Sequence, residues 1–398
     1  MTSALFRPAL VLGLLSCIGP FAIDMYLPAM PAIGIALGTS AQGMQGTITS
    51  YFVAFGLAQL FYGPWADHSG RKPPLYAGIA LFAVGTVLCM MASSVEGLMA
   101  GRFVQGLGGA AMGVVPRAIV RDMFTGPDAT RMMAAIFLVF SVSPMLAPLA
   151  GSGLLLVTGW RGIFAALLVA ALLSMALLAF GQPETLAPEN KRPFNLREMG
   201  QGTRELFRDR RFLLLTFGVA FGFSSFFVFL AAAAFVYQGF GLNPTQFSLA
   251  FACNAMAFIG TSQLASAAGQ RFGVLRLLKG ASLGFAVATS ALFLLALSGH
   301  VGLWTCIFGL AFANGFLGLI IPTSMVVALD DQGEKAGLAS SLSGTLQMLT
   351  GGVMVVALGP WLGADATPMI GGIALCAVIA LVLTLMVRDQ AAVSAAAD

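Results

Sequence analysis

The chain has 398 residues, of which 58% are hydrophobic and only 9% are charged, whereas a water-soluble domain carries about 25% charged residues. This composition excludes an ordinary soluble protein, and the formal net charge of +4 reflects basic residues in short connectors rather than a surface for nucleic acid. The five cysteines lie inside apolar runs without a CxxC pair or a His/Cys cluster, so we expect no disulfide, metal site or cofactor.

Apolar windows of about 20 residues recur along the whole chain, and this is the length that a helix needs to cross about 30 Å of hydrocarbon. Runs this long and this uniformly apolar favour helices over barrel strands. We therefore expect an all-α membrane protein with twelve transmembrane helices, near residues 8–30, 45–66, 74–92, 97–119, 131–156, 160–180, 212–235, 246–268, 274–298, 301–327, 336–357 and 367–387.

The first window holds a lone carboxylate, Asp24, in the stretch FAIDMYLPAMP (21–31). A carboxylate at membrane depth is costly, so we expect Asp24 to face the protein interior and to mark an ion or substrate path. The alternative is a signal peptide with Arg7 as its charged end. Asp24 and two prolines stand where the cleavage site should be, which disfavours that alternative.

The basic residues predict the orientation of the chain. If the N-terminus is cytoplasmic, every Lys and Arg except Arg102 and Arg161 falls in a cytoplasmic connector or at a cytoplasmic helix end. The excess of positive charge on the inside therefore predicts that both termini are cytoplasmic. Arg161 lies at a short outer turn, and Arg102 lies inside the fourth window.

One long polar connector divides the windows into six and six. We expect an N-terminal bundle at 1–181, a cytoplasmic linker at 182–211 and a C-terminal bundle at 212–398. A faint internal repeat supports this division, since GVVPRAIV (113–120) and LIIPTSMV (319–326) share a pattern. Two such bundles meeting at a central site are common among secondary transporters.

The connector after the second window reads GPWADHSGRK, with Gly63, Asp67, Gly70, Arg71 and Lys72 at fixed spacing. Gly70 supplies a permissive backbone at this short turn. The pattern resembles the G-x-x-x-D-x-x-G-R-[KR] signature of the major facilitator superfamily. A role for Arg71 and Lys72 in topology alone would leave the Gly/Asp spacing unexplained.

Further segments, DMYLPAMP, GRFVQGLG, the Arg121–Asp122 pair and SVSPMLAPLAG (141–151), are similar to the twelve-helix drug:proton antiporters of that superfamily. The bicyclomycin, chloramphenicol and florfenicol resistance branch is the most similar. Where the antiporter pattern usually has Gly-Pro, this chain has Ser143-Pro144 followed by Pro148, so the helix-bending prolines are kept.

The resemblance implies that Asp24 takes up and releases the coupling proton and that Arg102 tunes it. Counted along their helices, both residues lie at nearly the same depth, so the two charges would lessen each other's desolvation penalty. A fixed structural ion pair without titration is the alternative.

The resemblance also implies a conformational lock at the cytoplasmic helix ends, which holds the two bundles in the outward-open state. Its expected members are Gly63, Asp67, Gly70, Arg71, Lys72, Arg121 and Asp122.

Substrate contacts are expected from aromatic and amide side chains in the spans. Phenol rings offer both stacking and a hydrogen bond, and buried amides face a cavity or bridge helices. Most phenylalanines in such spans face lipid or neighbouring helices instead. A cavity with few charges suits bulky, mostly uncharged amphiphiles, and the candidates are Asp24, Tyr26, Tyr51, Gln105, Phe223, Phe227, Asn254, Asn314 and Gln347.

We expect a monomeric proton-coupled exporter of drug-like molecules in the inner membrane, with the proton as coupling ion and the lipid bilayer and an amphiphilic substrate as partners. A symporter that imports a small metabolite on the same fold is the alternative. The chain lacks GxxxxGK[ST] and HExxH, so we expect no enzyme. The absence of charged rings and of a repeated filter segment disfavours a channel.

Overall fold

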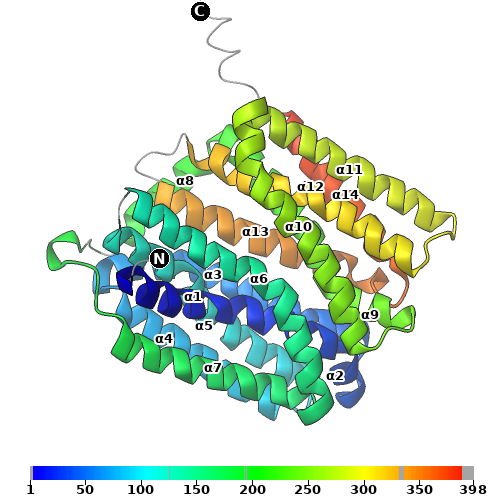
Figure 1. Cartoon of the computed structure of the whole chain (residues 1–398), viewed down its shortest axis with the longest axis horizontal. Helices are drawn as coiled ribbons and strands as arrows, with labels where there is room; N and C mark the ends of the chain where they lie inside the picture. The colour runs from blue at the N-terminus through cyan, green and yellow to red at the C-terminus, as the bar shows by residue number, and fades with distance from the viewer. Residues whose placement is uncertain (1–2, 125, 192, 194, 331–335, 388–398) are drawn as a thin grey trace, which may run out of the picture. The chain divides into compact units, whose positions relative to one another are not determined.

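A computed structural model describes residues 3–124, 126–191, 193, 195–330 and 336–387. All regular elements in this part of the chain are helices (Figure 1). Arg192, Lys335 and Arg388, three of the basic residues from which the orientation is predicted, lie outside the described residues.

The chain divides into two compact units, and the first contains Met1–Leu196 and Leu242–Phe251. Within it α5 packs against α3 and α4, α4 packs against α7, and α1 contacts α5, α6 and α7. The helices of this unit are α1 (Ser3–Asp24), the 3-10 turn η1 (Leu27–Ala29), α2 (Met30–Ala36), α3 (Ala41–Ser69), α4 (Lys72–Met91), α5 (Val95–Met123), α6 (Gly126–Thr158) and α7 (Trp160–Gly181).

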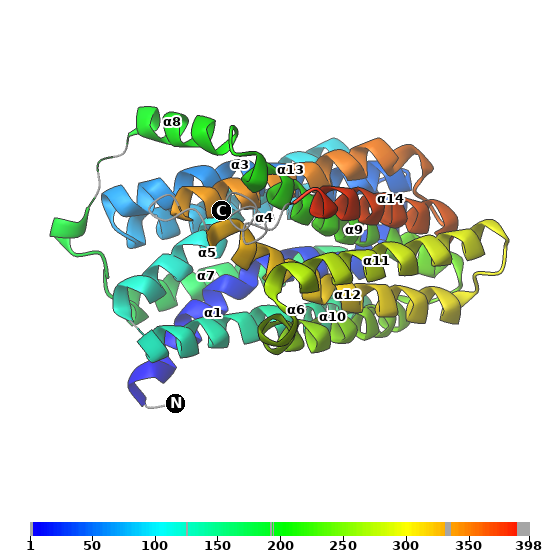
Figure 2. The same ribbon diagram turned by 90° about the horizontal axis from the view of Figure 1, so that it is seen from above.

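The second unit contains Arg197–Gly241 and Ala252–Asp398. Here α9 packs against α12, α13 and α14, while α11 lies alongside α12 and α14 (Figure 2). The predicted domain limits at 181 and 212 stay predictions. The remaining elements are η2 (Pro188–Asn190), α8 (Leu196–Leu206), α9 (Arg210–Gly239), α10 (Pro244–Phe272), α11 (Val274–Leu297), α12 (Leu303–Asp330), α13 (Ala336–Leu358), η4 (Gly359–Trp361) and α14 (Ala366–Leu385).

Ten segments of the described chain are long and apolar enough to cross a membrane. Helix α3 is not among them, because it carries polar residues such as Gln45, Thr47, Thr49 and Gln59 on its buried face. In α6 only the shorter apolar stretch Val142–Thr158 is found. The predicted window 45–66 therefore does not appear as a candidate span, and the window 131–156 stays a prediction, because part of it lies outside the described side chains.

Large apolar side chains remain exposed on the outer helices, as in a protein surrounded by lipid. On α7, Leu172, Leu173 and Phe180 are 56%, 60% and 87% exposed. Contiguous apolar surface of this kind marks contact with a membrane or a partner. Together with the ten spans, it makes the chain a multi-pass membrane protein.

The first span differs from the single helix predicted at 8–30, because α1 ends at Asp24. Pro28 has no N–H to donate to the carbonyl of Asp24, four residues earlier, and its ring would clash with that carbonyl. The chain therefore passes through η1 and resumes as α2, with Pro31 in its first turn. The expected buried acid is thus the last residue of a broken helix.

Helix α6 crosses the α1 break at close range. A Cβ atom on Gly151 would lie 2.1 Å from the Met25 carbonyl oxygen, so only glycine allows this approach. Pro144 and Pro148, the predicted bending prolines, both lie inside α6.

Candidate functional site

A fully buried arginine, Arg102, stands at the centre of the first unit. Its Nη1 donates to the Ala22 carbonyl oxygen at 2.9 Å and to Gln105 Oε1 at 2.6 Å. The Cζ atom lies 4.7 Å from the ring centroid of Tyr26 and 4.6 Å from that of Tyr51. Two aromatic faces therefore stabilise this charge.

Hydrogen bonds fix these groups between four helices. The Tyr26 hydroxyl and Thr47 Oγ1 are 2.6 Å apart, which joins the α1 break to α3. Gln105 Nε2 donates to Thr86 Oγ1 at 2.8 Å, which joins α5 to α4. Of the predicted substrate residues, the structure brings Tyr26, Tyr51 and Gln105 together around Arg102.

Asp24 is 5% exposed, and its carboxylate forms no hydrogen bond or ion pair within the described part of the chain. The guanidinium of Arg102 instead donates to the backbone carbonyl of Ala22, two residues before Asp24. Its Nε and Nη2 lack hydrogen-bond partners among the described residues. A fixed ion pair between these side chains is therefore absent from this conformation. Both remain buried on neighbouring helices, with groups still able to bond.

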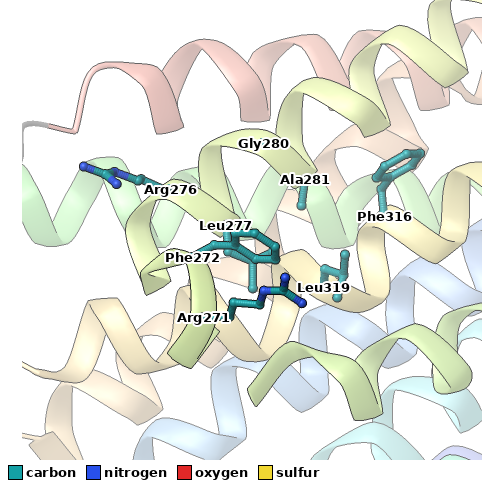
Figure 3. Close-up of a pocket in the computed structure, with 8 residues that line it drawn as sticks. All are labelled: Arg271, Phe272, Arg276, Leu277, Gly280, Ala281, Phe316 and Leu319. Carbon is teal, nitrogen blue, oxygen red and sulfur yellow. The ribbon is translucent and has the colours of Figure 1, made fainter. Parts of the chain in front are cut away.

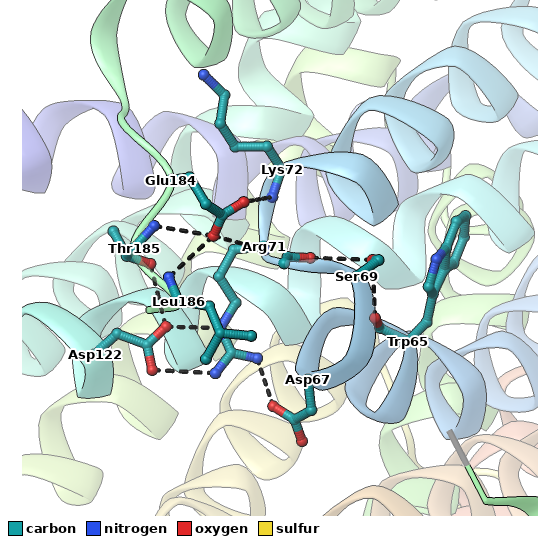
Figure 4. Close-up of polar contacts among 10 residues, drawn as sticks. Trp65, Asp67, Ser69, Arg71, Lys72, Asp122, Glu184, Thr185 and Leu186 are labelled. Atoms are coloured by element: carbon teal, nitrogen blue, oxygen red, sulfur yellow. Dashed lines mark hydrogen bonds and ion pairs between the residues drawn. The ribbon is translucent and has the colours of Figure 1, made fainter. Parts of the chain in front are cut away.

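The connector between α3 and α4 forms a second cluster, centred on Arg71 (Figure 4). Its guanidinium binds both oxygens of Asp122, with Nε to Oδ2 at 2.7 Å and Nη2 to Oδ1 at 3.1 Å, and its Nη1 binds Asp67. A two-point Arg–carboxylate contact is strong and directional. The structure thus brings three predicted lock residues together.

Glu184, which follows α7, completes this cluster and was not predicted. Its carboxylate accepts the backbone N–H groups of Arg71 at 2.9 Å and Lys72 at 3.1 Å. The next two residues of α4 are Pro73 and Pro74, which have no N–H. The carboxylate therefore satisfies the free donors at the start of α4, as an N-cap does.

Two further N–H groups, those of Thr185 and Leu186, also donate to Glu184. Burial alone would raise the pKa of this carboxyl, but the four backbone donors outweigh that effect and hold its pKa below the usual range. The Thr185 hydroxyl donates to Asp122 Oδ2 at 3.1 Å. The segment after α7 is thereby fastened to the ends of α4 and α5.

Other predicted lock residues contribute differently. Gly70 has φ +103°, a conformation that favours glycine, and a Cβ atom there would lie 2.7 Å from Glu184 Oε2 and would displace that carboxylate. The side chain of Lys72 lies over the Tyr76 ring at 5.8 Å. Arg121 is exposed, and Gly63 lies beside open space, so the structure does not bring these two into the cluster.

The predicted substrate residues of the second unit lie in separate contacts. Asn314 Nδ2 donates to Asn254 Oδ1 at 3.1 Å, which bridges α12 and α10. Gln347 bonds within its own helix, to Ser343. The rings of Phe223 and Phe227 are 6.1 Å apart, and Phe227 packs closely against Gly351 of α13.

Sequence reasoning missed Glu184 and Thr185 because the segment QPETL follows the last apolar run of the first half and reads as the start of a polar linker. The contact from Arg71 to Glu184 spans 113 residues, and no spacing rule links such positions. Gly70 in the sequence indicated a tight turn, but it did not indicate which residue contacts that turn.

The family model described as Major Facilitator Superfamily matches residues 12–355. The uncharacterized MFS-type transporter YdgK of Bacillus subtilis is 33% identical over 349 residues, which are 87% of each chain. A bicyclomycin resistance protein homolog of Haemophilus influenzae is 32% identical over 373 residues, 94% of each chain.

Among solved structures, a D-xylose-proton symporter superposes with a TM-score of 0.75 over 97% of this chain and 98% of the other, at 15% identity. An identity this low shows a shared fold only.

Proposed function

The chain belongs to the major facilitator superfamily, and on that premise we propose that it exports drug-like small molecules in exchange for protons. The observation that carries this proposal is Asp24, a buried carboxylate at a helix break that has no bonded partner among the described residues and lies on α1, which packs against the helix of Arg102. Ionisable residues inside a membrane protein mark proton relays and substrate paths. The bicyclomycin resistance homolog supports an antibiotic-like substrate.

In the proposed cycle Asp24 carries the coupling proton. A deprotonated Asp24 would attract Arg102, whose Nε and Nη2 have no hydrogen-bond partner among the described residues. When Asp24 is protonated, that attraction disappears and Arg102 stays between the rings of Tyr26 and Tyr51. Arg102 would thus have two positions, one near Asp24 and one between the tyrosine rings, and a change between them would couple proton binding to helix position.

The substrate would be a bulky, mostly uncharged amphiphile. Aromatic faces and amides can hold such a molecule without requiring a fixed charge on it. The proposed contacts are Asp24, Tyr26, Tyr51, Gln105, Phe223, Phe227, Asn254, Asn314 and Gln347.

The proposed architecture has twelve spans in two six-helix bundles, at 1–181 and 212–398, in the inner membrane with both termini cytoplasmic. The cluster around Arg71 would act as the conformational lock, broken and remade during each cycle, and Pro144 and Pro148 would bend α6. We propose a monomer that needs no cofactor and has no catalytic activity.

Replacing Asp24 with asparagine tests the proposal. The chain is expressed in an efflux-deficient bacterium and challenged with chloramphenicol, florfenicol and bicyclomycin, with and without a protonophore. Wild type should confer protonophore-sensitive resistance, and Asp24→Asn should lose it at an unchanged amount of inserted protein. Asp365→Asn is the matched control, because Asp365 caps α14 and asparagine caps equally well.

Unchanged resistance in Asp24→Asn would remove this carboxylate from the mechanism. Inverted vesicles decide the direction of transport. Acidification of their interior should drive substrate inward if the chain exchanges substrate for protons, whereas a symporter would lose substrate under the same gradient.

A further inference from the structure

An open groove of about 550 Å³ lies in the second unit, where α10 ends and α11 begins (Figure 3). It belongs to neither cluster described above. Both charged and apolar side chains line it: Arg271, Phe272, Arg276, Leu277, Gly280, Ala281, Phe316 and Leu319.

The charged part of the groove consists of two arginines on either side of the turn at Gly273. Both Arg271 and Arg276 are exposed, and within the described chain neither forms an ion pair with a carboxylate. The guanidinium of Arg271 lies 5.4 Å from the Phe272 ring centroid. Among the described residues, these two positive charges at the end of an apolar helix therefore have no counter-charge.

The apolar part of the groove runs from these arginines along α11 and α12. A Cβ atom on Gly284 would lie 2.4 to 2.8 Å from atoms of the Phe316 ring, so Phe316 packs directly on α11 and forms part of the groove wall. Beside Gly280 the space is open, since a Cβ atom there would have no neighbour within 4 Å. Phe316 and Leu319 are only half-buried.

Large apolar side chains are exposed around the groove, as on a surface that faces lipid. On α11, Leu283, Val287 and Leu294 are 53%, 59% and 66% exposed. On α12, exposed aromatic side chains recur every four residues, at Trp304, Phe308 and Phe312, and lead toward the groove. An acyl chain could therefore enter the groove directly from the bilayer.

We propose that this groove binds one anionic phospholipid, with the phosphate at Arg271 and Arg276 and part of one acyl chain along Ala281, Phe316 and Leu319. Basic pockets between transmembrane helices at the membrane surface attract anionic headgroups. A zwitterionic lipid carries a positive group in its own headgroup, which the two arginines would repel. Free phosphate would bind the arginines but would leave the apolar wall of the groove uncovered. The lipid is a partner of the whole protein, independent of the exported substrate.

Delipidated protein in detergent tests the proposal by native mass spectrometry, with dioleoylphosphatidylglycerol, dioleoylphosphatidylcholine and inorganic phosphate as probes. Wild type should bind phosphatidylglycerol in preference to the other two. Loss of one arginine should weaken that binding about fivefold, so the double variant Arg271→Gln/Arg276→Gln should weaken it about 25-fold.

Gly280→Leu fills the groove without changing its charge and should also abolish the preference. Arg204→Gln/Arg208→Gln removes two exposed charges elsewhere, and Gly260→Leu fills open space on α10, so both controls should bind as wild type does. Equal binding of the two lipids by wild type would overturn the proposal. Equal losses of phosphatidylglycerol binding in the variants and in the controls would also overturn it. Full retention of the preference for phosphatidylglycerol in Gly280→Leu would do the same.

Discussion

Glu184 offers the most direct test of the cluster at the α3–α4 connector, because its carboxylate caps α4 from the segment that follows α7. Loss of an N-cap costs about 1 kcal/mol, and loss of a negative charge at a helix N-terminus costs about 0.3–1 kcal/mol. Glu184→Ala should therefore destabilise the closed connector by about 1–2 kcal/mol, which raises its open population roughly 5- to 30-fold. Glu184→Gln keeps one acceptor oxygen and should fall between wild type and Glu184→Ala.

Hydrogen exchange measured by mass spectrometry in nanodiscs can follow this opening, since the amides of Arg71 and Lys72 are the groups that the carboxylate binds. Peptides covering residues 67–76 should exchange faster in Glu184→Ala, while peptides from α9 should not change. Glu189→Ala is the matched control, because Glu189 is an exposed acid five residues further along the same connector. Wild-type exchange in Glu184→Ala, or an equal increase in Glu189→Ala, would refute the capping argument.

The Glu184 carboxyl also predicts a pH dependence, because its pKa is lowered in the folded protein. Its contribution to the stability of the closed connector is fully present above the unfolded pKa of about 4.3. That contribution is lost as the pH falls through the folded pKa. Exchange of the connector, corrected for its intrinsic rate, should rise in acid for wild type but not for Glu184→Gln; parallel curves would contradict this. Gly151→Ala should lower the melting temperature, because its Cβ meets the backbone of the α1 break, at a cost of about 1–3 kcal/mol. Gly153→Ala, which has open space in the same helix, should be neutral or stabilising, and a reversed order in thermal unfolding would count against the close approach. A double-mutant cycle between Asn254→Ala and Asn314→Ala should give a coupling of about 0.6 kcal/mol; no coupling would mean that the inter-helix hydrogen bond contributes nothing.

The sequence predicted helical spans well wherever composition alone decides them, as at α11, expected at 274–298 and observed at Val274–Leu297. The prediction from hydrophobicity was wrong where a proline interrupts the backbone hydrogen bonds of an apolar run. Pro28 ends α1 at Asp24, although the apolar run continues without a gap.

Within the clusters, the resemblance to the family signature predicted Asp67 and Arg71, which lie on either side of the turn at Gly70. Spacing along the helices placed Asp24 and Arg102 at similar depth but could not show which atom Arg102 binds. That choice depends on the two tyrosine rings, one from the α1 break and one from α3, and no sequence pattern links these two positions. Tertiary packing, rather than any periodic pattern, decides such contacts.

The position of Glu184 in the chain has a consequence for biogenesis. A ribosome begins α4 at Lys72, 112 residues before it reaches this acid. During that interval the first turn of α4 has to rely on water or on other acceptors. The connector can therefore adopt its final form only after α7 has emerged and entered the bilayer, and its closure reports that the first half of the protein has been assembled.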